Sequence, residues 1–168
     1  YFPGIFVGIP AYEWTGSLQV ACGHEGGPWG HVNPLYLEEN GDLPMYTPCD
    51  PECDGGSLPR LWETYRGKRI ITPPHHVADY LHPYNWDVYD PAFEPVVEIF
   101  QDSRGTNEYP GAPGTTDVDH LDDPDLYVHH ALERGYRNGF IGGGDHHGVS
   151  LAGIYVKDIS RQGVFEGL

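Results

Sequence analysis

The stretch from Gly139 to Gly148 constrains this chain most, because an apolar run ends there in three consecutive glycines and three metal-capable side chains follow directly. The apolar run predicts the end of a buried β-strand. Glycine tolerates positive φ, so the chain can turn sharply after the strand. Asp145, His146 and His147 are then expected at the carboxyl end of that strand, where α/β folds place their chemistry.

The pair formed by Asp145 and His147 offers one carboxylate oxygen and one imidazole nitrogen, which suits a divalent transition metal. An isolated Asp-x-His sequence is more often a polar turn whose histidine faces water. The metal interpretation therefore depends on similar side chains elsewhere in the chain.

Two further strand ends supply such side chains. Glu13 follows the β-branched and aromatic run at residues 5–9, and the histidines His75 and His76 follow the strand predicted over residues 69–72. Pro73 and Pro74 restrict the backbone after the second strand and so orient the two imidazoles. Glu13 could equally be a solvated turn residue if it stood alone.

A third carboxylate, Glu98, lies within the apolar strand predicted over residues 95–100. A buried carboxylate is costly unless it is paired or binds a cation. Alternatively, Glu98 faces solvent on an alternating edge strand, because Val97 and Ile99 would share the opposite face.

Helix signals alternate with these strands. The clearest helix is predicted over residues 57–67, with Ser57 as its N-cap and one apolar face. A second helix is predicted over residues 123–137, and it contains His129 and His130, which we expect to be structural. Further strands are predicted at residues 31–37 and 151–156, and a last helix begins after Ser160. Strands alternating with helices predict parallel strands in a barrel or an open α/β sheet, within one domain spanning residues 1–168.

The charge balance restricts the partners. Lys and Arg number 9 against 25 Asp and Glu, giving a net charge of −16. A surface of this sign repels phosphate backbones and anionic membranes, so we expect neither nucleic acid nor membrane as a partner.

No apolar run approaches the roughly 20 residues that span a bilayer, and no targeting segment is recognisable, which leaves a cytoplasmic and a periplasmic location both open. Cys49 and Cys53 could form a disulfide, bind a metal or stay free thiols.

Five motifs in order resemble those of the PHP (polymerase and histidinol phosphatase) superfamily, and most closely its branch of poorly characterised metal-dependent phosphoesterase-like proteins. They are the strand followed by Pro-Ala-Tyr-Glu13, Gly30-His31-Val32-Asn33, the strand followed by Pro-His75-His76, Val97-Glu98-Ile99, and Gly143-Gly144-Asp145-His146-His147. The resemblance implies an α/β fold, a partial or distorted (β/α)7 barrel of the PHP type that resembles a TIM barrel. It also implies two or three Zn, Mn or Fe ions at the carboxyl ends of the strands.

The resemblance also implies roles for individual residues. The implied metal ligands are Glu13, His75, Glu98, Asp145 and His147. His31 and His76 match positions near the family's site, and Arg104 is a candidate for adding positive charge there. These three are the candidate catalytic residues.

The chain departs from the family at its start, because no His-x-His strand precedes Glu13. We expect that the chain is a piece of a longer protein, or that one metal position is lost. An incomplete barrel has an open edge, which a missing N-terminal segment or self-association would cover. We therefore expect the chain alone to be weak or inactive on simple phosphate esters, and a longer parent chain to be active.

Three functions follow. The first is a metal-dependent hydrolase, most plausibly a phosphoesterase acting on a phosphorylated small molecule with a metal-activated water. The second is a catalytically degenerate or structural protein. The third is hydrolysis of a carbamate, amide or non-phosphate ester, which the sequence cannot separate from the first.

Overall fold

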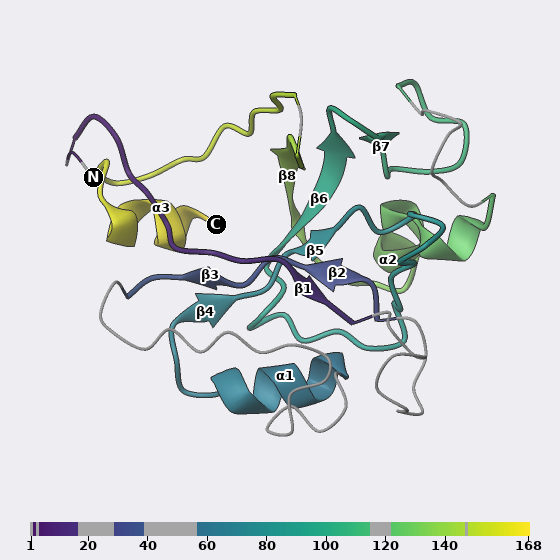
Figure 1. The fold of residues 1–168 in the computed structure, drawn as a ribbon, viewed down its shortest axis with the longest axis horizontal. Helices are drawn as coiled ribbons and strands as arrows, with labels where there is room; N and C mark the ends of the chain where they lie inside the picture. The colour runs from purple at the N-terminus through teal and green to yellow at the C-terminus, as the bar shows by residue number, and fades with distance from the viewer. Residues whose placement is uncertain (1, 3, 17–28, 39–56, 115–121, 147) are drawn as a thin grey trace.

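The structure is a computed structural model that describes residues 2, 4–16, 29–38, 57–114, 122–146 and 148–168. In these ranges the strands are β1 (Trp14–Thr15), β2 (His31–Val32), β3 (Leu35–Tyr36), β4 (Ile70–Ile71), β5 (Pro74–His75), β6 (Val96–Gln101), β7 (Gly105–Thr106) and β8 (Gly139–Gly143). The helices are α1 (Leu58–Tyr65), α2 (Val128–Glu133) and α3 (Arg161–Gly167), and a 3-10 helix, Pro124–Leu126, precedes α2. In Figure 1, α1 and α3 lie on different sides of the strands.

Antiparallel pairing organises the first half of the chain. β2 pairs with β1 on one side and β5 on the other, and β3 pairs with β4. The β3–β4 ladder continues the antiparallel register of the β2–β5 ladder: His31 lies opposite His75, and Tyr36 lies opposite Ile70. Pro34 falls between them, and because proline has no N–H to donate, it interrupts the ladder.

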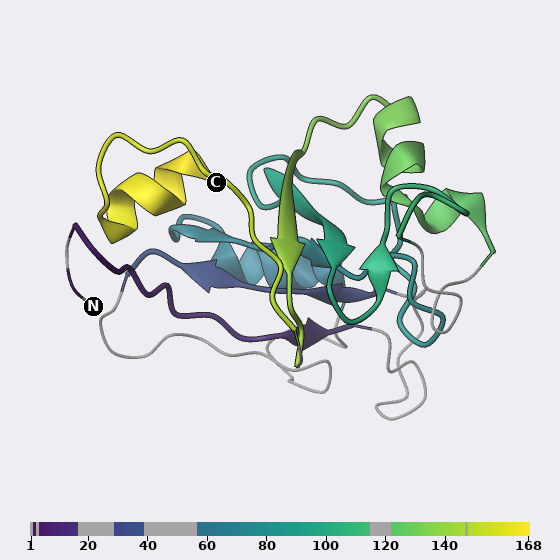
Figure 2. The ribbon, with the colours of Figure 1, turned by 90° about the horizontal axis from the view of Figure 1, so that it is seen from above.

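The longer strands form a second region. β6 pairs with β7 in antiparallel and with β8 in parallel orientation, so β6 is the middle strand. Figure 2 shows these three strands side by side. β5 also contacts β6, which brings the first region against the second.

The predicted (β/α)7 barrel is wrong. The described strands form three small sheets, mostly antiparallel, instead of one closed parallel barrel. The physical reason is strand direction, because residues 31–37 run antiparallel to residues 69–75 although α1 lies between them in sequence. Six of the eight described strands have two residues each, too few to close a barrel.

Two predicted strands are absent from the structure. Residues 5–9 form no strand, because the chain turns instead, and the Phe6 N–H donates to the Phe2 carbonyl at 2.8 Å. Residues 151–156 are irregular, with Leu151 88% exposed. β8 confirms the strand before the glycines, but Phe140 in it is 48% exposed, so the expectation of a buried strand is wrong.

Helix α1 confirms the prediction for residues 57–67. The Ser57 side chain accepts from the Arg60 N–H, as expected of an N-cap. The Trp62 indole donates to the Thr72 hydroxyl at 3.0 Å and stacks on Phe93. The predicted apolar face of α1 is buried and comprises Leu58, Leu61, Trp62 and Tyr65. The second predicted helix is shorter than expected and consists of the 3-10 helix and α2.

Within the described ranges, no helix combines the length and the apolar character needed to cross a membrane.

Candidate metal centre

Sheet register places the first members of the site. His31 lies opposite Thr15 on β1 and opposite His75 on β5, so these three side chains share one face of the sheet. Glu13 lies two residues before Thr15, and the period of two along a strand brings it to the same face. The His31 Nδ1 atom is 2.6 Å from Glu13 Oε1, which joins neighbouring segments directly.

Two members of the site adopt an uncommon backbone conformation. His76 has φ +32° and Asp145 has φ +52°, and no other non-glycine residue in the described ranges has positive φ. Such conformations are costly for residues with a Cβ and gather at functional sites. The turns that present these two side chains are therefore constrained by their surroundings.

Three potential ligand atoms face one another. Glu13 Oε1 lies 3.4 Å from His75 Nε2 and 3.5 Å from His76 Nε2. Ligands held about 2.1 Å from a tetrahedral zinc ion are separated by about 3.4 Å. Glu13, His75 and His76 thus form a group whose spacing matches a metal centre. Asp145 Oδ1, 4.0 Å from His75 Nε2, lies next to this group.

Glu98 lies behind His75. Its Oε1 atom is 3.0 Å from His75 Nδ1 and accepts from the His76 backbone N–H at 3.1 Å. Gln101 donates to the same oxygen at 3.4 Å. The Glu98 residue is 4% exposed, so the alternative that it faces solvent is wrong. A carboxylate on the far nitrogen of a ligating imidazole fixes the ring's tautomer and orientation.

Burial and neighbouring charges shift the pKa of each member of the group differently. Hydrogen bonding to His31 and His76, with the charges of His31 and His75, lowers the pKa of Glu13 far below its usual range despite partial burial. Burial would lower the pKa of His75, but the hydrogen-bonding and charge of Glu98, with the charges of Glu13 and Asp145, outweigh it and raise that pKa. Burial lowers the pKa of His76, which keeps its imidazole available as a neutral ligand.

The structure brings most of the predicted site residues together. Glu13, His75, Glu98 and Asp145 converge, although they are far apart in sequence. The candidate catalytic residues also lie there. His31 and His76 are both beside Glu13. Arg104 is beside Asp145, and its Nη1 donates to Asp145 Oδ2 at 2.8 Å. His147, Cys49 and Cys53 lie outside the described residues. Whether the converging residues bind a metal stays a prediction.

His129 and His130 lie on α2 and pair with other residues. His129 is near Glu133 and His130 is near Asp125, at 3.9 and 3.4 Å. Neither belongs to the group of potential ligands.

Sequence reasoning missed Asp79 and His82. Asp79 is 2% exposed, and its Oδ1 is 3.4 Å from His82 Nδ1. The His82 ring lies 4.1 Å from the His31 ring, measured between centroids. The available signal was an Asp-x-x-His sequence soon after His76, in a segment that shows no helix or strand pattern.

Because Gly143 has no side chain, the Glu98 carboxylate can lie directly against its backbone. A Cβ atom at position 143 would overlap with Glu98 Oε2. Because Glu98 is held by His75 and the His76 N–H, the displaced carboxylate would release both. We expect Gly143→Ala to weaken divalent metal binding about 10- to 100-fold, the usual cost of disturbing such a supporting group.

Calorimetric titration with Mn²⁺ measures this effect. Gly153→Ala is the matched control, because a Cβ there has no atom within 4 Å. Equal affinities of the Gly143→Ala variant and the unsubstituted chain would contradict the supporting role of Glu98.

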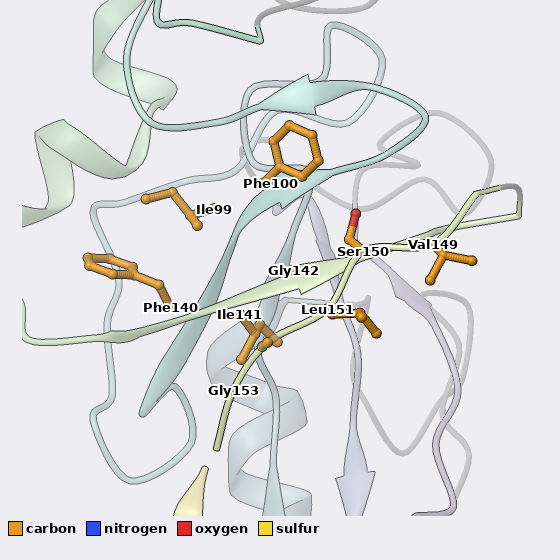
Figure 3. Close-up of a pocket in the computed structure, with 10 residues that line it drawn as sticks. Ile99, Phe100, Phe140, Ile141, Gly142, Val149, Ser150, Leu151 and Gly153 are labelled. Carbon is orange, nitrogen blue, oxygen red and sulfur yellow. The ribbon is translucent and has the colours of Figure 1, made fainter. Parts of the chain in front are cut away.

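A hollow lies away from the candidate metal centre. A cavity of about 370 Å³ is lined by Ile99 and Phe100 of β6, residues 140–142 of β8, and residues 149–153 of the segment that follows (Figure 3). None of the site residues lines it. The hollow therefore gives no support to the metal centre. Whether another chain or segment covers the exposed side of β8 stays a prediction.

Comparisons with protein-family models, with curated proteins and with solved structures found no match for the chain. The resemblance to the PHP superfamily stays a prediction, and the barrel that it implies is contradicted by the strand pairing.

Proposed function

We propose that the chain is a divalent metal-dependent hydrolase, with phosphate esters as its favoured substrates. The observation that carries the proposal is the group formed by Glu13, His75 and His76, whose ligand atoms lie within 4.8 Å of one another. Two imidazole nitrogens and one carboxylate oxygen are a donor set for Zn²⁺, Mn²⁺ or Fe²⁺. Asp145 adds a second oxygen nearby.

A bound metal of this kind supplies Lewis acidity, lowering the pKa of a coordinated water and neutralising phosphoryl oxygens. The residues of the chain hold the geometry in which this chemistry can act. His31 fixes Glu13 through the 2.6 Å contact, and the Glu98 carboxylate lies 3.0 Å from the far nitrogen of His75. Arg104 adds a fixed positive charge beside Asp145, where an anionic substrate would bind.

Access to solvent supports a catalytic centre over a purely structural metal. The Glu13 side chain is 33% exposed, whereas His75 and His76 are 6% and 1% exposed. The group is therefore closed on the histidine side and open at Glu13. Structural zinc sites are closed by four protein ligands, while catalytic sites keep a position open.

Metal content and turnover test the proposal together. The purified chain is stripped with a chelator, reloaded with Mn²⁺ or Zn²⁺, and analysed for bound metal by elemental analysis. We expect at least one ion per chain and metal-dependent hydrolysis of p-nitrophenyl phosphate. Bound metal without turnover on phosphate or carboxylate esters would favour the structural alternative, and turnover on carboxylate esters alone would favour a non-phosphate substrate. A chain that binds no ion contradicts the proposal.

A further inference from the structure

The guanidinium of Arg104 lies between two carboxylates. Its Nη1 atom donates to Asp145 Oδ2 at 2.8 Å, and its Nε atom lies 3.5 Å from Asp79 Oδ2. The side chains of Asp145 and Asp79 are 8% and 2% exposed, while that of Arg104 is 25% exposed. The two carboxylates are thus buried, and the side chain of Arg104 is the most exposed of the three.

Asp79 is itself fixed by the backbone. Its Oδ1 atom accepts from the N–H groups of Leu81 and His82, both at 2.9 Å. Its own N–H donates to the His76 carbonyl at 2.9 Å, so the turn that carries Asp79 starts at the candidate metal centre. One carboxylate oxygen therefore holds the turn, and the other faces Arg104.

We propose that Asp79 is a positioning residue that holds Arg104 beside the candidate metal centre, and that this guanidinium binds the anionic phosphoryl group of the substrate. The inference rests on the proposed function and specifies its substrate class. A guanidinium matches the planar spacing of phosphate oxygens, and its binding is strongest when the side chain is already held in place.

The geometry explains why an anion can bind to so acidic a chain. At a net charge of −16, the average surface repels a phosphate ester. Attraction then requires a local positive charge, and because Asp145 and Asp79 offset that of Arg104, a metal bound beside Asp145 would have to add to it. Two buried carboxylates fix that charge in a single position, which reduces the ordering cost on binding.

Binding of inorganic phosphate to the Mn²⁺-loaded chain tests the inference. Asp79→Asn keeps an Oδ1 acceptor for Leu81 and His82 but replaces the oxygen that faces Arg104 with an amide donor. We expect phosphate affinity to fall about tenfold, as for loss of one charge-assisted contact. The matched control is Asp87→Asn, which disturbs a 2.8 Å aspartate–arginine pair with Arg134 at the surface, and it should bind phosphate like the unsubstituted chain.

A double-variant cycle separates positioning from general structural damage. In the Arg104→Met background, Asp79→Asn should cause no further loss of phosphate affinity, because the group that it positions is gone. A full tenfold loss in that background overturns the inference. Unchanged phosphate affinity in Asp79→Asn, or a chain that binds no phosphate, also overturns it.

Two further measurements keep the test decisive. If Asp79→Asn fails to fold, Arg104→Lys replaces it, because the ammonium keeps the charge but lacks the Nε–H that faces Asp79. An unchanged phosphate affinity in Arg104→Lys overturns the inference. Titration with Mn²⁺ alone reports on the metal centre, so an unsubstituted chain that binds Mn²⁺ but no phosphate contradicts only the role of Asp79 and Arg104, and a chain that binds no Mn²⁺ contradicts the proposed function.

Discussion

The His75→Ala variant is expected to lose its divalent metal and, with it, hydrolysis of phosphate esters. His75 contacts three carboxylates of the site, with Glu13 at 3.4 Å, Glu98 at 3.0 Å and Asp145 at 4.0 Å. Alanine removes a ligand nitrogen and leaves these acidic groups without the imidazole between them. We expect metal affinity to fall at least about 100-fold and turnover by on the order of 1,000-fold.

The measurements are metal content per chain by elemental analysis and turnover of p-nitrophenyl phosphate with added Mn²⁺. His129→Ala is the matched control, since it removes an imidazole that is 60% exposed on α2 and pairs with Glu133. That variant should keep both metal and turnover. If His75→Ala retains the metal content of the unsubstituted chain, the assignment of this histidine as a ligand is wrong.

The convergence of the site was predictable because it depends on local signals. An apolar run followed by glycine or proline marks the point where a strand ends, and the side chains that follow it are placed near other strand ends. Glu13, His75 and Asp145 were singled out on this basis, and they lie together in the structure, although residues 5–9 before Glu13 form no strand. The same local signals correctly placed α1 and β6.

Strand direction was not predictable in this way. A β-branched run bounded by proline has the same pattern in a parallel and an antiparallel ladder, so the pairing of β2 with β5 depends on contacts between distant segments. The alternation of strands with helices and the resemblance to a barrel family both predicted parallel strands, and this direction was wrong for all the described pairs except β6 with β8. Asp79 was missed for a related reason, because its burial and its contact with Arg104 depend on tertiary packing.

Exposure of β8 shows the limit of the apolar pattern. Gly139 to Gly143 carry only two side chains larger than hydrogen, and the neighbours on the strand's outer side decide whether they are buried. β6 covers one edge of β8, and Phe140 stays 48% exposed. The sequence pattern predicts a strand, and packing decides its burial.

The Glu94→Gln variant is expected to gain stability relative to the unsubstituted chain as the pH rises. Glu94 is fully buried, and its Oε1 atom accepts a hydrogen bond from the Tyr84 hydroxyl. Its Oε2 atom has no hydrogen-bond partner among the described residues. Burial raises the pKa of Glu94 well above its ordinary value of 4.5, although the Tyr84 hydrogen bond opposes the rise.

The direction follows from proton binding. Below about pH 4.5 the Glu94 carboxyl is protonated in the folded and the unfolded chain, so its contribution to stability is fully present. Above that pH the unfolded chain releases the proton while the folded chain retains it, and folding stability falls until the raised folded pKa is passed. Each pH unit in this window costs about 1.4 kcal/mol, against the 5–15 kcal/mol typical of a domain.

Urea unfolding at several pH values between 4.5 and 7.5 measures this difference. Glutamine cannot ionise, so the free energy of unfolding of Glu94→Gln minus that of the unsubstituted chain should rise with pH, whatever constant offset the amide introduces. The subtraction removes the contribution of other titrating groups such as Glu13, whose lowered pKa acts in the opposite direction at acidic pH. Glu63→Gln is the matched control, because that carboxylate is 62% exposed on α1 and should give a difference that does not change with pH. A difference for Glu94→Gln that is equally flat would show that the buried carboxyl ionises at its ordinary pKa.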